Sequence, residues 1–234
     1  MIRHHPDDAL LLAHVAGNLP TGAAIVVESH LEVCSTCCER LQVLQAMGGV
    51  LLEDIAPVAM QPDALTRALA AIDGVDVGMP AASAAGAAQA PTRGAGRSRP
   101  ASSGRPELPA GTRWPRALEG CTVSPWRWLG PGMRWSRVTV PHDRSANVFL
   151  LRIGAGKRLP QHTHSELELT QVLHGAFGDD RSRYAQGDFD GADGEVVHEP
   201  VVAAGEECIC LTTVQGRVLF KGAIARTVGA LVGM

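Results

Sequence analysis

The chain lacks the features that would tie it to a membrane or to nucleic acid. None of its 234 residues lies in an apolar run of about 18 or more, so we expect no transmembrane helix. Basic residues are not in excess, since the formal net charge is −3, whereas phosphate binding needs concentrated Lys and Arg. Two histidines and two acidic residues precede the first hydrophobic stretch, which is unlike a signal peptide. We therefore expect a cytoplasmic protein that neither enters a membrane nor binds DNA directly.

Cysteine is scarce, but half of the cysteines are clustered. The chain has six, at Cys34, Cys37, Cys38, Cys121, Cys208 and Cys210. In a reducing compartment, clustered Cys with His nearby indicates metal binding before a disulfide. Cys121 has no evident partner. Cys208 and Cys210 share strand parity, and we expect buried apolar residues there, with redox-active thiols as the alternative.

The first third of the chain has the pattern of short helices. Apolar residues recur every three or four positions and form one stripe on a long helix, at Leu41, Leu44, Met47 (or Gly48), Leu51 and Ile55. Capping and breaking residues divide residues 7–73 into four helical segments. The first is capped by Asp7 and Asp8 and ends at Gly17-Asn18-Leu19-Pro20, and the second is capped by Thr21. The third is capped by Ser35 or Thr36 and stops at Pro57, and the fourth begins at Pro62-Asp63. This pattern predicts a helical bundle.

A change of composition separates this region from a β-rich one. Residues 74–112 are dominated by Ala, Gly, Pro, Ser and Arg, and such a segment cannot bury enough surface to offset its ordering entropy. From about Trp114 onward, short apolar runs are separated by turn residues, which is typical of a sandwich or small barrel: Ser136–Val140, Val148–Ile153, Leu167–Leu173, Cys208–Val214 and Val218–Phe220. The predicted organisation is α+β, with a helical domain over 1–75, a flexible linker over 76–112 and a β-domain over 113–234.

The helical region contains a metal-ligand spacing. His30, Cys34 and Cys37 form H-x3-C-x2-C, and a helical turn brings residues three and four apart onto one face. Structural Zn²⁺ takes four N or S ligands, so a fourth must come from elsewhere. The candidates are His4, His5 and His14, with Cys38 a poorer one because it points elsewhere on the helix than Cys37. The alternative is a helical bundle with incidental Cys and His.

The β-domain contains a second spacing. It is Gly156-(x5)-His162-Thr163-His164-(x3)-Glu168-(x6)-Gly175. Residues of equal parity share one face of a strand, so the two histidines and the glutamate should point together into a barrel. Imidazoles with a carboxylate suit zinc, manganese or iron. Glu166 has the same parity and is a rival ligand, whereas His142 and His174 lack motif support.

The N-terminal spacing resembles that of a known family. His5, His30, Cys34 and Cys37 match the H…H-x3-C-x2-C pattern of the zinc-binding anti-sigma factors, and residues 1–11 resemble the start of the ChrR-type members. The resemblance implies that His5, not His4, is the fourth zinc ligand. It also implies that the helical domain clamps an extracytoplasmic-function sigma factor and blocks its access to RNA polymerase core. Within this fold, zinc serves in some relatives as a thiol switch and in others as a structural pin.

The second spacing resembles the first cupin motif, and a weaker second motif follows. Gly187-Asp188 begins a turn, and His198 lies eleven residues after Gly187. The resemblance implies a metal held by His162, His164, Glu168 and His198. The second motif departs from the cupin pattern at three positions, where Pro, Gly and Asn are replaced by Asp193, Glu195 and Val202. We expect a reshaped turn that keeps the ligand histidine.

The order of the two modules bears on function. A helical zinc domain, a linker and a cupin domain resemble ChrR-type anti-sigma factors over most of the folded chain, which implies a non-enzymatic regulator whose cupin domain senses singlet oxygen or organic hydroperoxide and favours release of the sigma factor. The main alternative is a cupin metalloenzyme of the dioxygenase or isomerase type with an accessory zinc domain. A third is a cupin that binds a small molecule without turnover. The sequence does not indicate an oligomeric state.

Overall fold

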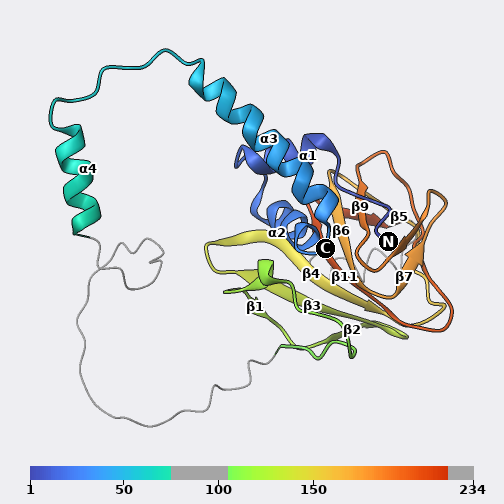
Figure 1. Ribbon diagram of the computed structural model, residues 1–234. Coiled ribbons are helices and arrows are strands. Elements are labelled where there is room, and N and C mark those ends of the chain that lie inside the picture. The colour runs from blue at the N-terminus through green and yellow to red at the C-terminus, as the bar shows by residue number, and fades with distance from the viewer. Residues whose placement is uncertain (75–104, 221–234) are drawn as a thin grey trace, which may run out of the picture. The chain divides into compact units, whose positions relative to one another are not determined.

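The computed structural model describes residues 1–74 and 105–220 and has helices followed by strands (Figure 1). The helices are α1 Asp8–Val15, α2 Thr21–Leu31, α3 Ser35–Glu53 and α4 Ala64–Asp73, with a 3-10 turn, η1, at Arg116–Leu118. The strands are β1 Thr122–Val123, β2 Arg127–Gly130, β3 Met133–Val140, β4 Asp143–Ile153, β5 His162–His164, β6 Glu168–His174, β7 Ala176–Gly178, β8 Arg183–Ala185, β9 Phe189–Ala192, β10 Val201–Val202, β11 Cys208–Val214 and β12 Val218–Phe220. The predicted α+β class is confirmed. Residues 76–104 of the predicted linker lie outside the described residues.

The helix boundaries follow the capping residues closely. Asp7 is the N-cap of α1, because its Oδ1 accepts a hydrogen bond from the Leu10 N–H at 2.8 Å. The cap predicted at Thr21 is wrong by one residue: Pro20 is the N-cap of α2, and Thr21 lies in the first turn. The reason is that Pro20 already has extended backbone angles (φ −54°, ψ 146°) ahead of the helix.

The chain forms two compact units, one of Met1–Gly48 with Ser102–Met234 and one of Gly49–Ala101. We call residues 1–48 the head, residues 49–74 the extension and residues 105–220 the β-domain. One hydrophobic cluster contains head residues such as Leu11 and Val26 together with Leu150 and Leu211 of the β-domain. The head therefore shares a core with the β-domain. The domain boundary at residue 75 stays a prediction.

Antiparallel strands build the β-domain. Its largest sheet has the order β1-β3-β4-β11-β6-β9, with β2 paired to β3; β10-β7-β8 and β12-β5 form two smaller sheets. Side chains on β6 alternate between the two faces of the large sheet. Leu169 belongs to the cluster shared with the head, while Glu168 and Thr170 line a cavity on the opposite face. One sheet thus separates the head from the barrel interior.

Helix α2 of the head packs on one face of the large sheet, against β4, β11 and β6 (Figure 1). The packing is close at Gly22, where an added Cβ would lie 2.3 Å from the Thr213 Oγ1. A second link is polar: the Glu32 carboxylate accepts hydrogen bonds from the Arg116 and Ala117 N–H groups of η1 at 2.9 and 2.7 Å. Over the described ranges, no helix is long and apolar enough to cross a membrane.

Candidate metal centres

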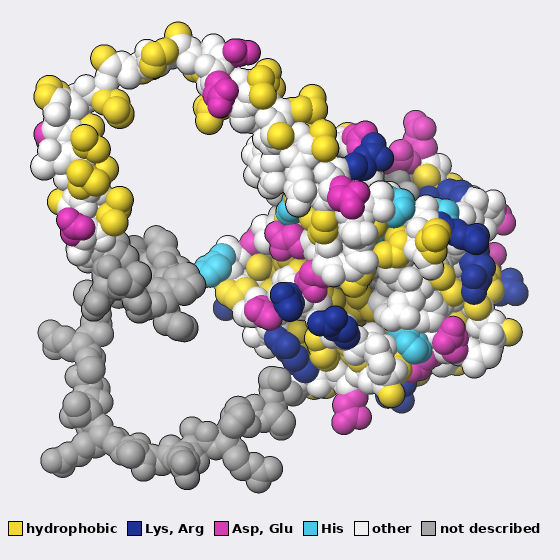
Figure 2. Space-filling view, viewed as in Figure 1, with side chains coloured by type: hydrophobic (Ala, Val, Ile, Leu, Met, Phe, Trp, Pro, Cys, Tyr) yellow, Lys and Arg dark blue, Asp and Glu magenta, His cyan; other side chains and the backbone are white. Residues whose placement is uncertain are grey.

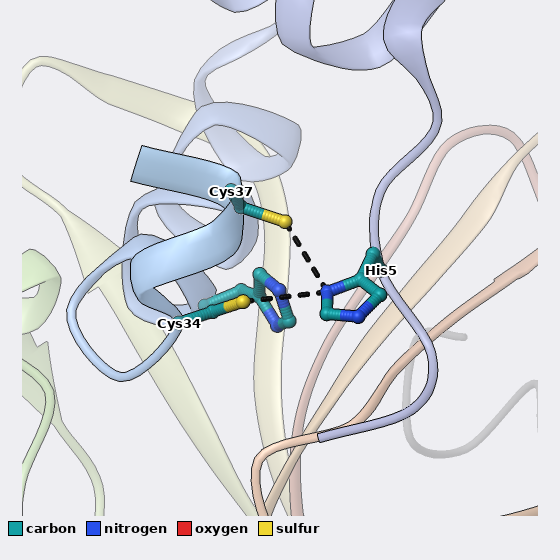
Figure 3. A group of neighbouring side chains, drawn as sticks. His5, Cys34 and Cys37 are labelled. Atoms are coloured by element: carbon teal, nitrogen blue, oxygen red, sulfur yellow. Dashed lines mark hydrogen bonds between the residues drawn. The ribbon is translucent and has the colours of Figure 1, made fainter. Parts of the chain in front are cut away.

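The first cluster lies where the chain's first residues meet the start of α3 (Figure 3). The His5 Nδ1 lies 3.3 Å from the Cys34 Sγ and 3.3 Å from the Cys37 Sγ. His30, near the end of α2, completes the group: one ligand atom from each of the four residues lies within 4.8 Å of the others. His5 is exposed, whereas the other three residues are buried. The structure therefore brings together the four residues predicted for the head.

The chemistry of these side chains fits a metal ion. The His30 Nε2 is buried without a hydrogen-bond partner among the described residues, and burial lowers the pKa of His30 to about 4, so its ring is neutral at pH 7. Burial, reinforced by Cys34, raises the pKa of the Cys37 thiol to about 12. A buried thiol of this kind binds as thiolate only when a cation displaces its proton. Two sulfurs and two imidazole nitrogens are a typical structural zinc set.

The rival fourth ligands have other contacts. The His4 Nε2 lies 3.0 Å from the Ser182 Oγ, and the His4 ring stacks at a tilt on Tyr184. The Cys38 Sγ donates to the Leu31 carbonyl at 3.0 Å. His14 is outside the cluster. The geometry agrees with the fourth ligand that the resemblance implied.

The second cluster lies in the interior of the β-domain. Its three histidines turn Nε2 toward one point: the His198 Nε2 lies 3.1 Å from that of His162 and 3.3 Å from that of His164. The Glu168 Oε2 lies 3.0 Å from the His164 Nε2 and 3.5 Å from the His198 Nε2. All four residues are buried. The structure brings together the four residues predicted for the β-domain.

These residues converge for a different reason from the one predicted. The expectation of one strand through both histidines and the glutamate is wrong, because β5 ends at His164 and β6 begins at Glu168. The two strands belong to different sheets, and the turn between them brings Glu168 back toward the histidines. The backbone of His198 pairs with that of His162, with N–H to carbonyl distances of 3.1 and 3.0 Å. Glu166 is exposed and lies outside the cluster.

The protonation states of the second cluster also fit a divalent cation. Burial disfavours the charged form of Glu168, but hydrogen bonds from His164 and His198 outweigh burial and hold its pKa below the usual range. Burial lowers the pKa of His162 to about 4. The His162 Nδ1–H donates to the Pro160 carbonyl at 2.8 Å, which leaves the Nε2 lone pair facing the cluster. Burial opposes the charged form of His198, but the hydrogen bond to Glu168 and the charge of Glu168 outweigh burial and raise its pKa. Imidazoles with an ionised carboxylate are ligands for first-row metals.

The charged residues around His198 have no signal in the sequence. The Asp179 Oδ2 lies 3.4 Å from the His198 Nδ1, and the Arg181 Nη2 lies 2.7 Å from Asp179 and 2.8 Å from Asp190. The Arg181 guanidinium already supplies the positive charge beside these two carboxylates, so they are not a further metal site. No ligand spacing marks them, because they meet only after β7, β8 and β9 have folded together.

Comparisons with known proteins cover both clusters. Residues 116–218 match a family profile described as the ChrR Cupin-like domain. The Anti-sigma-E factor ChrR of Cereibacter sphaeroides is 37% identical over 229 residues, which cover 97% of this chain and 96% of that protein. The chain belongs to the ChrR family. A crystal structure of Rhodobacter sphaeroides SigE in complex with the anti-sigma ChrR matches with a TM-score of 0.67 and 32% identity, covering 92% of this chain and 100% of that chain.

This ChrR-family chain keeps His198 in the cluster although its second cupin motif is altered. Asp193 replaces the usual Pro, and its Oδ1 accepts the Glu195 N–H at 3.0 Å, while its carbonyl accepts the Val196 N–H at 3.2 Å. This is an Asx turn, in which the Asp side chain accepts a hydrogen bond from the backbone two residues on. The turn leaves His198 in the cluster, and its difference from the usual cupin turn stays a prediction.

Proposed function

We propose that this chain is a cytoplasmic anti-sigma factor that binds and inhibits an extracytoplasmic-function sigma factor and does not contact DNA itself. The observation that carries the proposal is the 37% identity to Anti-sigma-E factor ChrR over 97% of the chain, which includes the head, the extension and the β-domain together. The match to the chain of ChrR in its complex with SigE covers 92% of this chain and supports the same partner.

A concentration of exposed apolar side chains supports this function. Large hydrophobic residues of α3, α4 and the segment between them are exposed at Val43, Met47, Val50, Leu51, Leu52, Ile55, Val58, Met60, Leu65, Leu69 and Ile72 (Figure 2). We call this set the apolar stripe. Exposed apolar surface on this scale marks a protein-binding site, and an amphipathic helix typically lays such a face into a hydrophobic groove of its partner. We propose that the sigma factor covers the apolar stripe.

We propose zinc for the head, held by His5, His30, Cys34 and Cys37. Two thiolates with two imidazoles favour zinc over the harder divalent cations. For the β-domain we propose zinc or another divalent first-row metal, held by His162, His164, Glu168 and His198. The metal would supply a Lewis-acidic centre there, while the protein supplies buried, oriented ligands.

We further propose that the β-domain is needed for release of the sigma factor under oxidative stress such as singlet oxygen or organic hydroperoxide. The cavity beside the second cluster has a volume of about 30 Å³ and is lined by His162, Glu168 and Cys208 among others. Such a cavity holds a molecule of about the size of water.

The function is tested with the full-length chain, purified with each extracytoplasmic-function sigma factor of its host. We expect one of these sigma factors to co-purify with the chain and to lose transcription activity with RNA polymerase in its presence. Cys37→Ala should release the head metal and abolish inhibition, because it removes a ligand from the centre that holds α2, α3 and the N-terminal segment together. Failure of the metal-loaded wild-type chain to bind any of these sigma factors would overturn the proposal.

The matched control is Cys38→Ala. Cys38 is the neighbour of Cys37, but its sulfur contacts the Leu31 carbonyl instead of the cluster. This variant should retain the head metal, sigma-factor binding and inhibition. Equal loss in the two variants would show that helix damage, and not metal loss, explains the effect of Cys37→Ala.

A further inference from the structure

Gln171 connects the β-domain to the head cluster. It lies on β6 with 1% of its surface exposed, and its Oε1 lies 3.0 Å from the His30 Nδ1. Its Nε2 donates to the Gly187 carbonyl at 3.1 Å. This second bond fixes the orientation of the amide, because only the NH2 group can donate to a carbonyl. The oxygen therefore faces His30, and the His30 Nδ1 must carry the proton.

This tautomer is the one that a metal at the head cluster requires. With the proton on Nδ1, the lone pair of His30 is on Nε2, the buried atom without a hydrogen-bond partner among the described residues. Phe189 of β9 packs edge-on against the same ring, with centroids 5.6 Å apart. Residues of two β-domain strands thus contact the His30 ring, in addition to His5 of the head, which packs edge-on against it at 5.6 Å.

The β-domain also holds the segment that carries His5. The Asp188 Oδ1 accepts the Arg3 and His4 N–H groups at 2.6 and 3.1 Å, and the Phe189 N–H donates to the His4 carbonyl at 3.1 Å. Gly187 has φ +91°, and an added Cβ there would lie 2.8 Å from Ile2. The Gly-Asp turn of the second cupin motif therefore also binds the N-terminal segment.

We propose that Gln171 is a positioning residue for His30 and that the β-domain supplies the outer shell of the head's metal site. The proposal rests on the proposed metal in the head. It implies that separation of the head from the β-domain weakens metal binding by the head, and by thermodynamic reciprocity that loss of this metal weakens the contact. Glu168 lies three residues before Gln171 on the opposite face of β6, so one strand supports both centres.

The test measures how fast the head releases its metal in the full-length chain. Loading with Co²⁺ distinguishes the two centres, because among the proposed ligands only those of the head include thiolates, which give a sulfur-to-cobalt charge-transfer band. Decay of this band in excess chelator gives the release rate for wild type and for Gln171→Leu. Second-shell partners of metal-bound histidine typically contribute about 10- to 100-fold in affinity, so we expect Gln171→Leu to release cobalt about 10- to 100-fold faster.

Two variants separate positioning from packing. Gln171→Glu keeps a carboxyl oxygen that can accept the His30 Nδ1–H, so its release rate should be no more than about threefold faster than that of wild type. Gln186→Leu makes the same substitution at an exposed residue and should match wild type. If Gln171→Leu does not fold, Gln171→Met, which has nearly the same shape without the amide, takes its place.

The release rates of these variants distinguish positioning by Gln171 from simple packing. A folded Gln171→Leu or Gln171→Met with the wild-type release rate overturns the inference, and so does equal acceleration in Gln171→Glu and Gln171→Leu, because packing alone would then explain both. Fast release that Gln171→Glu restores supports it. Absence of the thiolate band from wild-type protein would instead overturn the proposed metal in the head, which is a distinguishable failure.

Discussion

At the scale of single residues, Asp188 shows how a buried carboxylate joins two parts of the chain. Burial disfavours its charge, but the N–H groups of Ala185, Arg3 and His4 outweigh this effect and hold its pKa below the usual range. A pKa lowered by folding means that the carboxylate contributes stability above its unfolded pKa of about 3.9, and that this contribution is lost as the pH falls through the folded value.

Asp188→Asn should therefore destabilise the chain by about 1–3 kcal/mol at pH 7, because the amide nitrogen cannot accept the Ala185 N–H. The difference in unfolding free energy from wild type should narrow below about pH 4, because there the unfolded wild-type chain binds a proton that the folded carboxylate still lacks. Unfolding in denaturant from pH 7 to pH 3 measures it. Asp180→Asn, at an exposed position, is the control and should match wild type throughout. A difference that stays constant down to pH 3 would contradict this account of Asp188.

The ligand residues were predictable from the sequence, but their supporting residues were not. The spacing of His30, Cys34 and Cys37 is local, so one helix end and one turn suffice to bring them together. Gln171 and Asp188 have no such signal, since Gln and Asp are common in many settings. They act on the head only because β6 and β9 pack beneath it, which a single sequence does not reveal.

At the scale of secondary-structure elements, the close contact of α2 with the large sheet depends on Gly22, which has no side chain. Gly22→Ala should destabilise the chain by about 1–3 kcal/mol, because the new methyl group would overlap the Thr213 Oγ1 and crowd the Val148 Cγ2. Thr213→Ala should recover part of this loss in the double variant, as a positive coupling in a double-mutant cycle measured by denaturant unfolding. Gly49→Ala, on α3 with no atom near its Cβ, is the control and should not destabilise. Equal stability of Gly22→Ala and Gly49→Ala would contradict close packing of α2.

The elements themselves were predicted unevenly. The runs at Cys208–Val214 and Val218–Phe220 are confirmed as β11 and β12, because apolar runs between turn residues define strands locally. The long helix is confirmed as α3, but it ends at Glu53, before the last predicted apolar position, Ile55. The surface that covers these apolar side chains was not predictable. Leu41 and Leu44 pack against the core shared by the head and the β-domain, whereas Leu51 and Ile55 are exposed. Periodicity identifies an apolar face but not what covers it.

The exposed face leads to a prediction for α3 and α4. Leu51→Asp and Leu69→Asp together should reduce sigma-factor binding at least about 100-fold, because each replaces an exposed apolar anchor with a charge that the interface would have to desolvate. The midpoint of unfolding should change little, since both side chains are already exposed. Titration calorimetry with the co-purifying sigma factor measures the affinity. Gln61→Asp, also exposed, adds charge outside the apolar stripe and is the control. Unchanged affinity in the double variant would show that the sigma factor binds elsewhere.

At the scale of the whole molecule, the two centres lie on opposite sides of one sheet. The head's apolar core and the His30–Gln171 contact are on one side, and the Glu168 cluster is on the other. A signal received in the β-domain changes sigma-factor binding only if it stabilises one of two states of the chain more than the other. We expect the contact between the head and the β-domain to differ between two such states.

This arrangement predicts that the two centres have separable roles. His162→Ala or Glu168→Ala should leave sigma-factor binding in unstressed conditions within about threefold of wild type, because the apolar stripe and the head cluster are unchanged. Either variant should blunt the release of the sigma factor by singlet oxygen or organic hydroperoxide, because the β-domain would lose its metal and with it the responsive state. Affinity measurements, together with transcription from a sigma-dependent promoter before and after stress, test both halves. His142→Ala, which removes a histidine outside both clusters, should respond as wild type does. Loss of sigma-factor binding in Glu168→Ala with the head metal retained would mean that the β-domain centre is required for inhibition itself, and the division of roles would then be wrong.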